Sequence, residues 1–153
     1  MTGDTPLHVA VLNGPNLNLL GEREPGIYGR TTLLEINEHL AGVAAGLGLK
    51  LSCTQSNSEG ALIDTIHGWR AGGVRGALVN AGAFTHTSLA MRDALAGVAV
   101  PFIEVHLTNI YAREAERRHS MLASAALGVI CGFGAHSYEL ALRALAHQMM
   151  AQP

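Results

Sequence analysis

Short apolar runs alternate with helical patterns along the chain, and this alternation constrains the fold more than any other feature of the sequence. The runs at residues 76–80, 98–106 and 127–132 are largely apolar and lack the period-two pattern of a strand with one wet face. Such strands are typical of parallel sheets covered by helices on both faces. The sequence therefore predicts an α/β protein with a flavodoxin-like, doubly wound, five-stranded parallel sheet and helices on both faces.

Local start and stop signals place the expected elements. Thr32 and Glu35 have the spacing of a capping box at the start of a helix that ends near residue 46. Ser58 is suited to cap a second helix, and two glycines at 72–73 stop it. Further helices are expected at residues 85–96, 109–119 and 137–150, and the first two strands at residues 7–13 and 49–56.

An unusually long connection follows the first strand. It runs from Asn13 to Arg30, whereas strand-to-helix connections in α/β proteins need only a few residues. Glycines and prolines punctuate it, so we expect no regular element there but a lid or a binding loop. The loop carries a guanidinium, Arg23, and a phenol, Tyr28, and together they make it a candidate for function.

Polar residues gather where the expected strands end, which is where open α/β sheets bind their ligands. They are Asn13, Asn16, Ser56, Asn57, Asn80, Gly82, Glu104 and His106. Glu104 and His106 are two apart on one strand, so their side chains share a face and the carboxylate can hold one imidazole tautomer. The alternative is that both are simply polar residues of a fraying strand end.

Other basic residues are weaker candidates. His86 is expected at a helix start, where the positive end of the helix dipole favours a neutral imidazole, but a plain helix-cap histidine fits the same position. Arg113, Arg117 and Arg118 follow the fourth strand, and guanidinium forks suit carboxylate recognition. Two glutamates alternate with these arginines, so a solvated charged face is the alternative interpretation.

Composition narrows the classes of protein. The 153 residues are expected to form one domain, and a net charge of −2 without a basic run argues against a nucleic-acid partner. No apolar run reaches the ~20 residues of a membrane span, and no secretory signal pattern starts the chain. Cys53 and Cys131 lie in apolar runs and are expected to be buried free thiols, which favours a cytoplasmic protein.

The sequence lacks metal-binding and nucleotide-binding motifs, and it contains few charged residues. No cysteine and histidine spacing matches a metal site, and no glycine-rich nucleotide fingerprint follows the first strand. We therefore expect a pocket without metal or cofactor for a small anionic polyol. Charged residues make up only 14% of the chain, against about 25% in a typical globular protein. Part of the surface is therefore expected to form a subunit interface of a homo-oligomer.

The connection after the first strand also carries a family resemblance. Residues 13–29 read NGPNLNLLGEREPGIYG, which resembles the N-terminal signature of the type II 3-dehydroquinases, or 3-dehydroquinate dehydratases. The resemblance continues, in order, through residues 55–64, 78–95, 101–120 and 128–142. It implies a single dehydroquinase domain over residues 1–153 and a homo-oligomer, a dodecamer built from trimers. It also implies a cofactor-free lyase that dehydrates 3-dehydroquinate to 3-dehydroshikimate, in the shikimate pathway or in quinate breakdown.

The resemblance also assigns roles to residues. Tyr28 resembles the base that takes the proton next to the ketone, with Arg23 and Arg113 as the arginines that support it. His106, backed by Glu104, resembles the acid that protonates the departing hydroxyl, and Asn16 resembles the residue that binds the enolate side through water. The implied substrate-binding set is Asn80, Gly82, His86, Asp93, Leu107, Thr108 and Arg117, of which Asp93 serves in part from a neighbouring subunit.

The sequence departs from common forms of the family motif at a few positions. Leu107 and Thr108 replace the usual Ile-Ser, Ser58 stands where histidine is frequent, and Cys131 occupies a variable position. Threonine keeps both the hydroxyl and the backbone donor, so the contact to a substrate carboxylate is expected to survive. The rival function is a flavodoxin-like module that binds a flavin or a nucleotide phosphate. Such a module would need a short, hydroxyl-rich loop after the first strand, whereas the loop here is long. A third alternative is a purely structural homomer, but the polar residues at the strand ends would then have no function.

Overall fold

A five-stranded parallel sheet forms the centre of the protein. The computed structural model describes residues 5–22 and 24–151, and its strands follow the order β2-β1-β3-β4-β5. The strands are β1 His8–Asn13, β2 Lys50–Gln55, β3 Val74–Asn80, β4 Phe102–His106 and β5 Gly128–Cys131. Every neighbouring pair runs parallel. This is the flavodoxin-like, doubly wound order, so the predicted fold class is confirmed.

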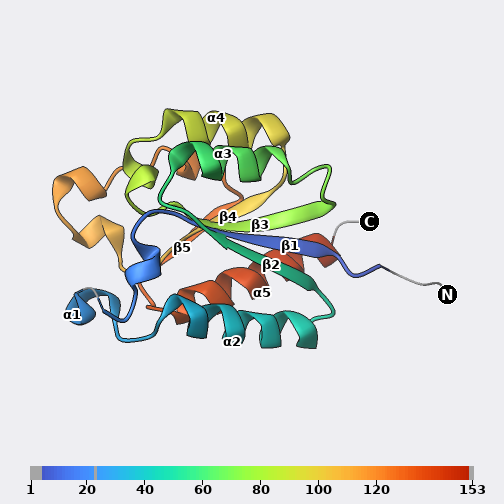
Figure 1. Cartoon of the computed structure of the whole chain (residues 1–153), viewed down its shortest axis with the longest axis horizontal. Helices are drawn as coiled ribbons and strands as arrows, with labels where there is room; N and C mark the ends of the chain where they lie inside the picture. Colours follow the sequence, from blue (N-terminus) through green and yellow to red (C-terminus); the bar gives the residue numbers. More distant parts are fainter. Residues whose placement is uncertain (1–4, 23, 152–153) are drawn as a thin grey trace.

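Helices cover both faces of the sheet (Figure 1). The four long helices are α2 Leu33–Gly46, α3 Glu59–His67, α4 Leu89–Val98 and α5 His136–Met150. α2 and α5 lie on one face, and α3 and α4 lie on the other. Along β1, Val9 and Val11 pack into the apolar cluster of α2 and α5, whereas Ala10 and Leu12 pack into that of α3 and α4. Both faces of the strand are therefore dry, which explains its continuous apolar run.

The predicted helix starts are confirmed by their hydrogen bonds. The backbone N–H of Glu35 donates to the Thr32 hydroxyl at 3.2 Å, and the Thr32 N–H donates back to the Glu35 carboxylate, also at 3.2 Å. Ser58 accepts the N–H of Ala61 at 3.2 Å. These contacts join residues three apart, so the sequence alone is enough to find them.

The chain around the fourth helix differs from the prediction. Gly82–His86 forms a 3₁₀ turn, and α4 begins only at Leu89, because the Ser88 side chain caps it by accepting the N–H of Met91. The helix continues to Val98, and Ala99 then takes a left-handed conformation with φ 56°. β4 therefore starts at Phe102 rather than at residue 98.

The secondary structure of two further segments differs from the prediction. Residues 109–119 form two 3₁₀ turns, Ile110–Ala112 and Ala115–Arg117, in place of a polar helix. The long connection after β1, expected to be irregular, contains the 3₁₀ turn Leu17–Leu19 and the four-residue helix α1, Pro25–Tyr28. Proline at the first position of α1 suits a helix start, which the punctuation by glycine and proline concealed.

The expectation of two buried thiols is wrong for Cys53, which is exposed, while Cys131 is half-buried. They lie on β2 and β5, the two edge strands of the sheet. An edge strand has a neighbour on only one side, so its apolar run is less well covered than that of a central strand. Among the described residues, no helix is long and apolar enough to cross a membrane.

Candidate active site

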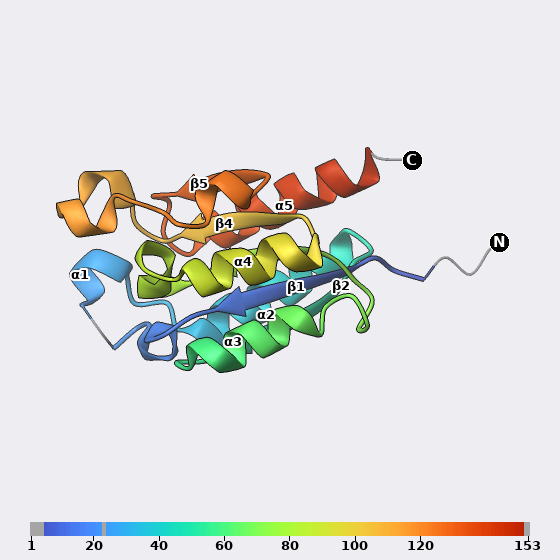
Figure 2. The ribbon, with the colours of Figure 1, turned by 90° about the horizontal axis from the view of Figure 1, so that it is seen from above.

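A cavity of about 120 Å³ lies at the carboxyl ends of the central strands. Its lining residues are Pro15, Asn16, Leu17, Tyr28, Asn80, Gly82, Ala83, His86, His106, Leu107, Thr108, Ile110, Arg113 and Arg117. Figure 2 shows α1 and the turns after β4 close together, beyond the end of the sheet to which the β1 arrow points. All but three of the residues to which the family resemblance gives a role line this cavity, the exceptions being Arg23, Asp93 and Glu104. The other candidates from the strand ends and the arginine cluster do not line it: Asn13, Ser56, Asn57 and Arg118.

The three exceptions have different explanations. Arg23 lies outside the described residues. Asp93 lies on the exposed side of α4, away from the cavity. Glu104 is fully buried behind the cavity wall, where it contacts a residue that does line it.

The floor of the cavity is formed where two loops approach very closely. Gly82 has φ 58°, and a Cβ built there would lie 2.9 Å from the Pro15 carbonyl oxygen. A Cβ on Gly14 would lie 2.2 Å from the Ala81 carbonyl oxygen, closer than atoms can approach. The loops after β1 and β3 therefore need glycine at both positions to meet. The Gly14 N–H donates to the Asn80 carbonyl at 2.8 Å and fixes this approach.

Tyr28 and Arg113 form one wall of the cavity. The Arg113 Nη1 donates to the Tyr28 hydroxyl oxygen at 2.9 Å, and the guanidinium carbon lies 5.4 Å from the centre of the ring. Only 17% of the Arg113 side chain is exposed. A shielded guanidinium that donates to a phenol oxygen can stabilise negative charge on that oxygen. The predicted proximity of Arg113 to the tyrosine is thus seen in the structure.

His106 also lines the cavity, and it forms a buried pair with Glu104. The His106 Nε2 and the Glu104 Oε2 are 2.5 Å apart, the carboxylate is fully buried, and 7% of the imidazole is exposed. The pair is therefore not a fraying strand end, because both side chains are buried although His106 is the last residue of β4. Ser120, which sequence reasoning missed, donates its hydroxyl to the Glu104 Oε1 at 2.7 Å. With Nε2 occupied by the carboxylate, Nδ1 is the imidazole nitrogen left for a ligand.

A second missed residue supports Asn80 from below. The hydroxyl of Tyr138 on α5 donates to the Asn13 Oδ1 at 2.6 Å and accepts from the Asn80 Nδ2 at 2.8 Å. Tyr138 is fully buried, and burial raises the pKa of its phenol, so it stays protonated. Its position on a helix that follows the last strand gave no sign of this contact in the sequence.

His86 and Arg117 complete the rim. His86 ends a 3₁₀ turn instead of starting a helix, so the helix-dipole argument for its protonation state was wrong. Its Nδ1 lies 2.7 Å from the His119 carbonyl oxygen, which can only accept, so Nδ1 carries the proton. Arg117 lines the cavity but also pairs with Glu114, as the charged-face alternative proposed.

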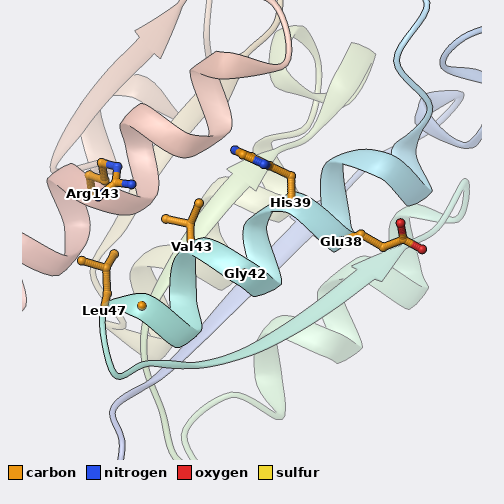
Figure 3. A pocket seen from close by; sticks show the side chains of 7 residues that line it. Glu38, His39, Gly42, Val43, Leu47 and Arg143 are labelled. Atoms are coloured by element: carbon orange, nitrogen blue, oxygen red, sulfur yellow. The ribbon is translucent and has the colours of Figure 1, made fainter.

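A larger cavity, of about 530 Å³, lies between α2 and α5. Figure 3 shows side chains of α2 along it, including His39 and Val43, with Arg143 contributed by α5. None of the predicted site residues lies there, and its basic groups are already engaged by Glu139. Size alone therefore does not identify the site, and the smaller cavity is the better candidate. Within residues 5–22 and 24–151, no group of three or more His, Cys, Asp or Glu side chains could hold a metal ion.

The fold and the small cavity together define a flavodoxin-like α/β protein whose strand ends carry an acid–base site. A phenol paired with a guanidinium and an imidazole paired with a buried carboxylate line the same cavity, a combination suited to moving protons on a polar substrate. The chain belongs to the class II dehydroquinase family, whose family model matches residues 7–146. This membership decides against the rival flavin- or nucleotide-binding module.

Individual relatives agree with the family assignment. The chain is 66% identical to the 3-dehydroquinate dehydratase of Gemmatimonas aurantiaca, over 90% of each chain. It is 59% identical to the 3-dehydroquinate dehydratase of Synechococcus sp. strain CC9605, over 91% of this chain and 94% of the relative. Among solved structures, the type II dehydroquinase from Butyrivibrio crossotus superposes with a TM-score of 0.90 at 38% identity, covering 93% of this chain and 99% of that one. The type II dehydroquinase from Propionibacterium acnes gives 0.88 at 39% identity, over 94% and 99% of the two chains.

Proposed function

We propose that the protein is a 3-dehydroquinate dehydratase, a lyase that converts 3-dehydroquinate to 3-dehydroshikimate and water. Family membership supports the substrate, and the contact between Arg113 and Tyr28 in the cavity is the observation that carries the chemistry. The reaction belongs to the shikimate pathway, and its chemistry is shared with quinate breakdown. The overall change breaks one C–H bond and one C–O bond and forms a carbon–carbon double bond.

Tyr28 is the proposed base for the first step. Its phenolate oxygen takes the proton from the carbon next to the ketone, and the electron pair moves onto the ketone oxygen to give an enolate. Arg113 stabilises the phenolate by its hydrogen bond and its position over the ring. Arg23 is proposed as the second supporting arginine, on the strength of the family resemblance. Asn16, which lines the cavity, binds the enolate side through water.

His106 is the proposed acid for the second step. The enolate collapses, the carbon–carbon double bond forms, and the hydroxyl leaves with a proton from the imidazole as water. The buried carboxylate of Glu104 stabilises the imidazolium that donates this proton. Tyr28 and His106 line the same cavity, which supports an elimination with separate groups for the two proton transfers.

The remaining lining residues are proposed to bind the substrate. Asn80, Gly82 and His86 present amide, backbone and imidazole groups to its hydroxyls, and the backbone of Leu107 and Thr108 receives its carboxylate. Arg117 adds a cation at the rim. The Thr108 hydroxyl takes the place of the serine hydroxyl that is more usual in the family. Asp93 is proposed to complete the site of a neighbouring subunit.

The wider organisation is proposed from the same family resemblance. Residues 1–153 form a single dehydroquinase domain that works in the cytoplasm without metal or cofactor. Copies of the chain assemble into a dodecamer built from trimers. The low content of charged residues, 14%, supports an extensive subunit interface.

The test of this function is direct. The double bond of the product conjugates with its carbonyl groups, so ultraviolet absorbance should grow when 3-dehydroquinate is added to the purified protein. Tyr28→Phe removes only the proton acceptor and is expected to abolish turnover. Calorimetry with a stable product-like ligand should then show nearly wild-type binding. Near-normal turnover by this variant would exclude Tyr28 as the base, and no turnover by the wild type would exclude the proposed function.

A further inference from the structure

The hydroxyl of Ser120 occupies a central place behind the cavity. It lies 2.7 Å from the Glu104 Oε1, and its oxygen accepts the backbone N–H groups of Leu122 at 3.1 Å and Ala123 at 3.0 Å. Ser120 itself does not line the cavity. Ser120 can therefore affect the reaction only indirectly, and among these three partners only Glu104 contacts a residue that lines the cavity.

The direction of the hydrogen bond to Glu104 follows from counting donors and acceptors. A serine hydroxyl has one proton and two lone pairs. Both lone pairs of Ser120 receive backbone N–H groups, so its one proton is available only for the Glu104 Oε1. The structure therefore makes Ser120 a fixed donor to this carboxylate, and donation to a carboxylate favours its ionised form.

The other carboxylate oxygen faces the imidazole. Oε2 of Glu104 lies 2.5 Å from the His106 Nε2, and an ionised carboxylate can only accept there. The proton between the two groups then belongs to Nε2, and Nδ1 of His106 is the nitrogen that exchanges its proton with the substrate. A rotation of the carboxylate would break this arrangement, and Ser120 prevents that rotation by holding Oε1.

We propose that Ser120 is a positioning residue for the reaction, one that keeps Glu104 ionised and oriented and so fixes the tautomer and the proton affinity of His106. The expected effect on kcat rests on the proposed function. The expected effect on the protonation of His106 depends only on the contacts among Ser120, Glu104 and His106. Removing the hydroxyl makes the ionised form of Glu104 less favourable and frees the carboxylate to rotate away from the imidazole. The imidazolium of His106 then loses stabilisation, and His106 should give up its added proton at a lower pH.

Other groups around the pair stay unchanged in this experiment and act as a constant background. Those that line the same cavity or lie beside the pair on neighbouring elements are Tyr28, His86, Arg113, Arg117, Tyr111 and Cys131. Because each keeps its position when Ser120 loses one oxygen atom, a change in the pH behaviour of His106 reports on Glu104.

Ser88 provides a matched control. Its hydroxyl accepts the backbone N–H of Met91 at 3.0 Å and donates to the Glu59 Oε2 at 2.5 Å, so it makes the same kinds of bond as Ser120. It caps α4 and is not in contact with His106. Ser88→Ala therefore removes a hydroxyl that caps backbone N–H groups and donates to a carboxylate, as Ser120→Ala does. It does so at a position that does not contact His106.

The kinetic experiment compares the pH dependence of kcat for the wild type, Ser120→Ala, Ser120→Thr and Ser88→Ala. Ser120→Ala should lower kcat about tenfold, as expected for one lost hydrogen bond to a charged group, with little change in KM. The limb of the profile that reports on His106 should move to lower pH. Ser120→Thr keeps the donor and should restore the limb, while Ser88→Ala should leave it in place. An unmoved limb in Ser120→Ala, or an equal shift in Ser88→Ala, would overturn the inference.

A second measurement does not depend on turnover. Diethyl pyrocarbonate modifies only neutral imidazole, so mass spectrometry of the His106 peptide after brief treatment gives the pH at which this ring loses its proton. That pH should be lower in Ser120→Ala than in the wild type and unchanged in Ser88→Ala. An equal or higher pH in Ser120→Ala would refute the role of Ser120. A wild type without turnover but with the expected shift would refute only the proposed function.

Discussion

The Arg113 guanidinium lies over the ring of Tyr28 and donates to its hydroxyl oxygen at 2.9 Å, although 85 positions separate the two residues. Tyr28 ends a short helix in the connection after β1, and Arg113 follows a 3₁₀ turn after β4. The parallel sheet brings the two connections to the same edge. The tertiary fold therefore holds the proposed base and its supporting cation together, although the two residues are far apart in the sequence.

Replacing Arg113 by lysine should separate charge from geometry. Lysine keeps the positive charge but lacks the planar fork that can face the phenol oxygen while stacking on the ring. We expect Arg113→Lys to lower kcat by about 10- to 100-fold, equivalent to about 1.4–2.7 kcal/mol, with a smaller effect on KM. Steady-state kinetics tests this, with the exposed Arg70→Lys as the control. Equal kcat values for the two variants would leave Arg113 without a part in the chemistry.

Replacing Tyr138 by phenylalanine should weaken both stability and binding. The change leaves the Asn13 Oδ1 and the Asn80 Nδ2 buried without the partner they share, which costs about 1–3 kcal/mol. Asn80 also loses the contact that orients its amide, so KM should rise. Urea unfolding and steady-state kinetics measure the two effects.

Ser137→Ala is the control for Tyr138→Phe. Its buried hydroxyl lies on the same turn of α5 and accepts the Phe133 N–H at 3.0 Å, so it touches neither Asn13 nor Asn80. It should lower stability without raising KM. A KM that rises equally in both variants would mean that α5 supports the site only as a whole.

Assembly can be tested through Asp93. Light scattering should give a mass many times the 16.0 kDa of one chain. Because Asp93 lies on the exposed side of α4, we expect Asp93→Ala to lose activity by damaging a neighbour's site. Dissociating and reassembling a mixture of Asp93→Ala and Tyr28→Phe should then recover activity, since some sites combine intact residues from two chains. A mixture of Tyr28→Phe and His106→Asn, both damaged within one chain, should not recover. Recovery in neither mixture, or an active monomer, would contradict shared sites.

The carboxylate of Glu139 on α5 should make stability depend on pH. Hydrogen bonds from His39 first and from Arg143 second lower its pKa in the folded protein. A group whose pKa is lowered on folding stabilises the folded state above its unfolded pKa, about 4.3 for glutamate, and loses this contribution as the pH falls through the folded value. Glu139→Gln should therefore melt at a lower temperature than the wild type at pH 7. The difference should vanish at the most acidic pH, and a difference that stays the same from pH 7 down to that pH would contradict this prediction.

Residue patterns determined the class of fold and most of the site. Helix starts at Thr32 and Ser58 depend on contacts three residues apart, so they can be read along the chain. Polar residues at strand ends, such as Asn80 and His106, are identified because parallel strands bring their carboxyl ends to one edge of the sheet. Prediction from local sequence patterns was wrong where tertiary packing determines the secondary structure. Examples are the 3₁₀ turns at residues 110–117 and the start of α4 at Leu89, later than predicted.

Only the tertiary structure revealed the residues that act from behind the cavity. Ser120 and Tyr138 carry no motif of their own, and their partners lie 16 and 58 or more positions away, on other elements. The exposure of Cys53 likewise depends on which strand becomes the edge of the sheet, and Asp93 does not line the candidate cavity of its own chain. Sequence spacing determines which side chains share a strand or a helix face. Which of those faces meet across the core depends on how the helices pack on the sheet. This packing involves residues from the whole length of the chain, so no local segment determines it.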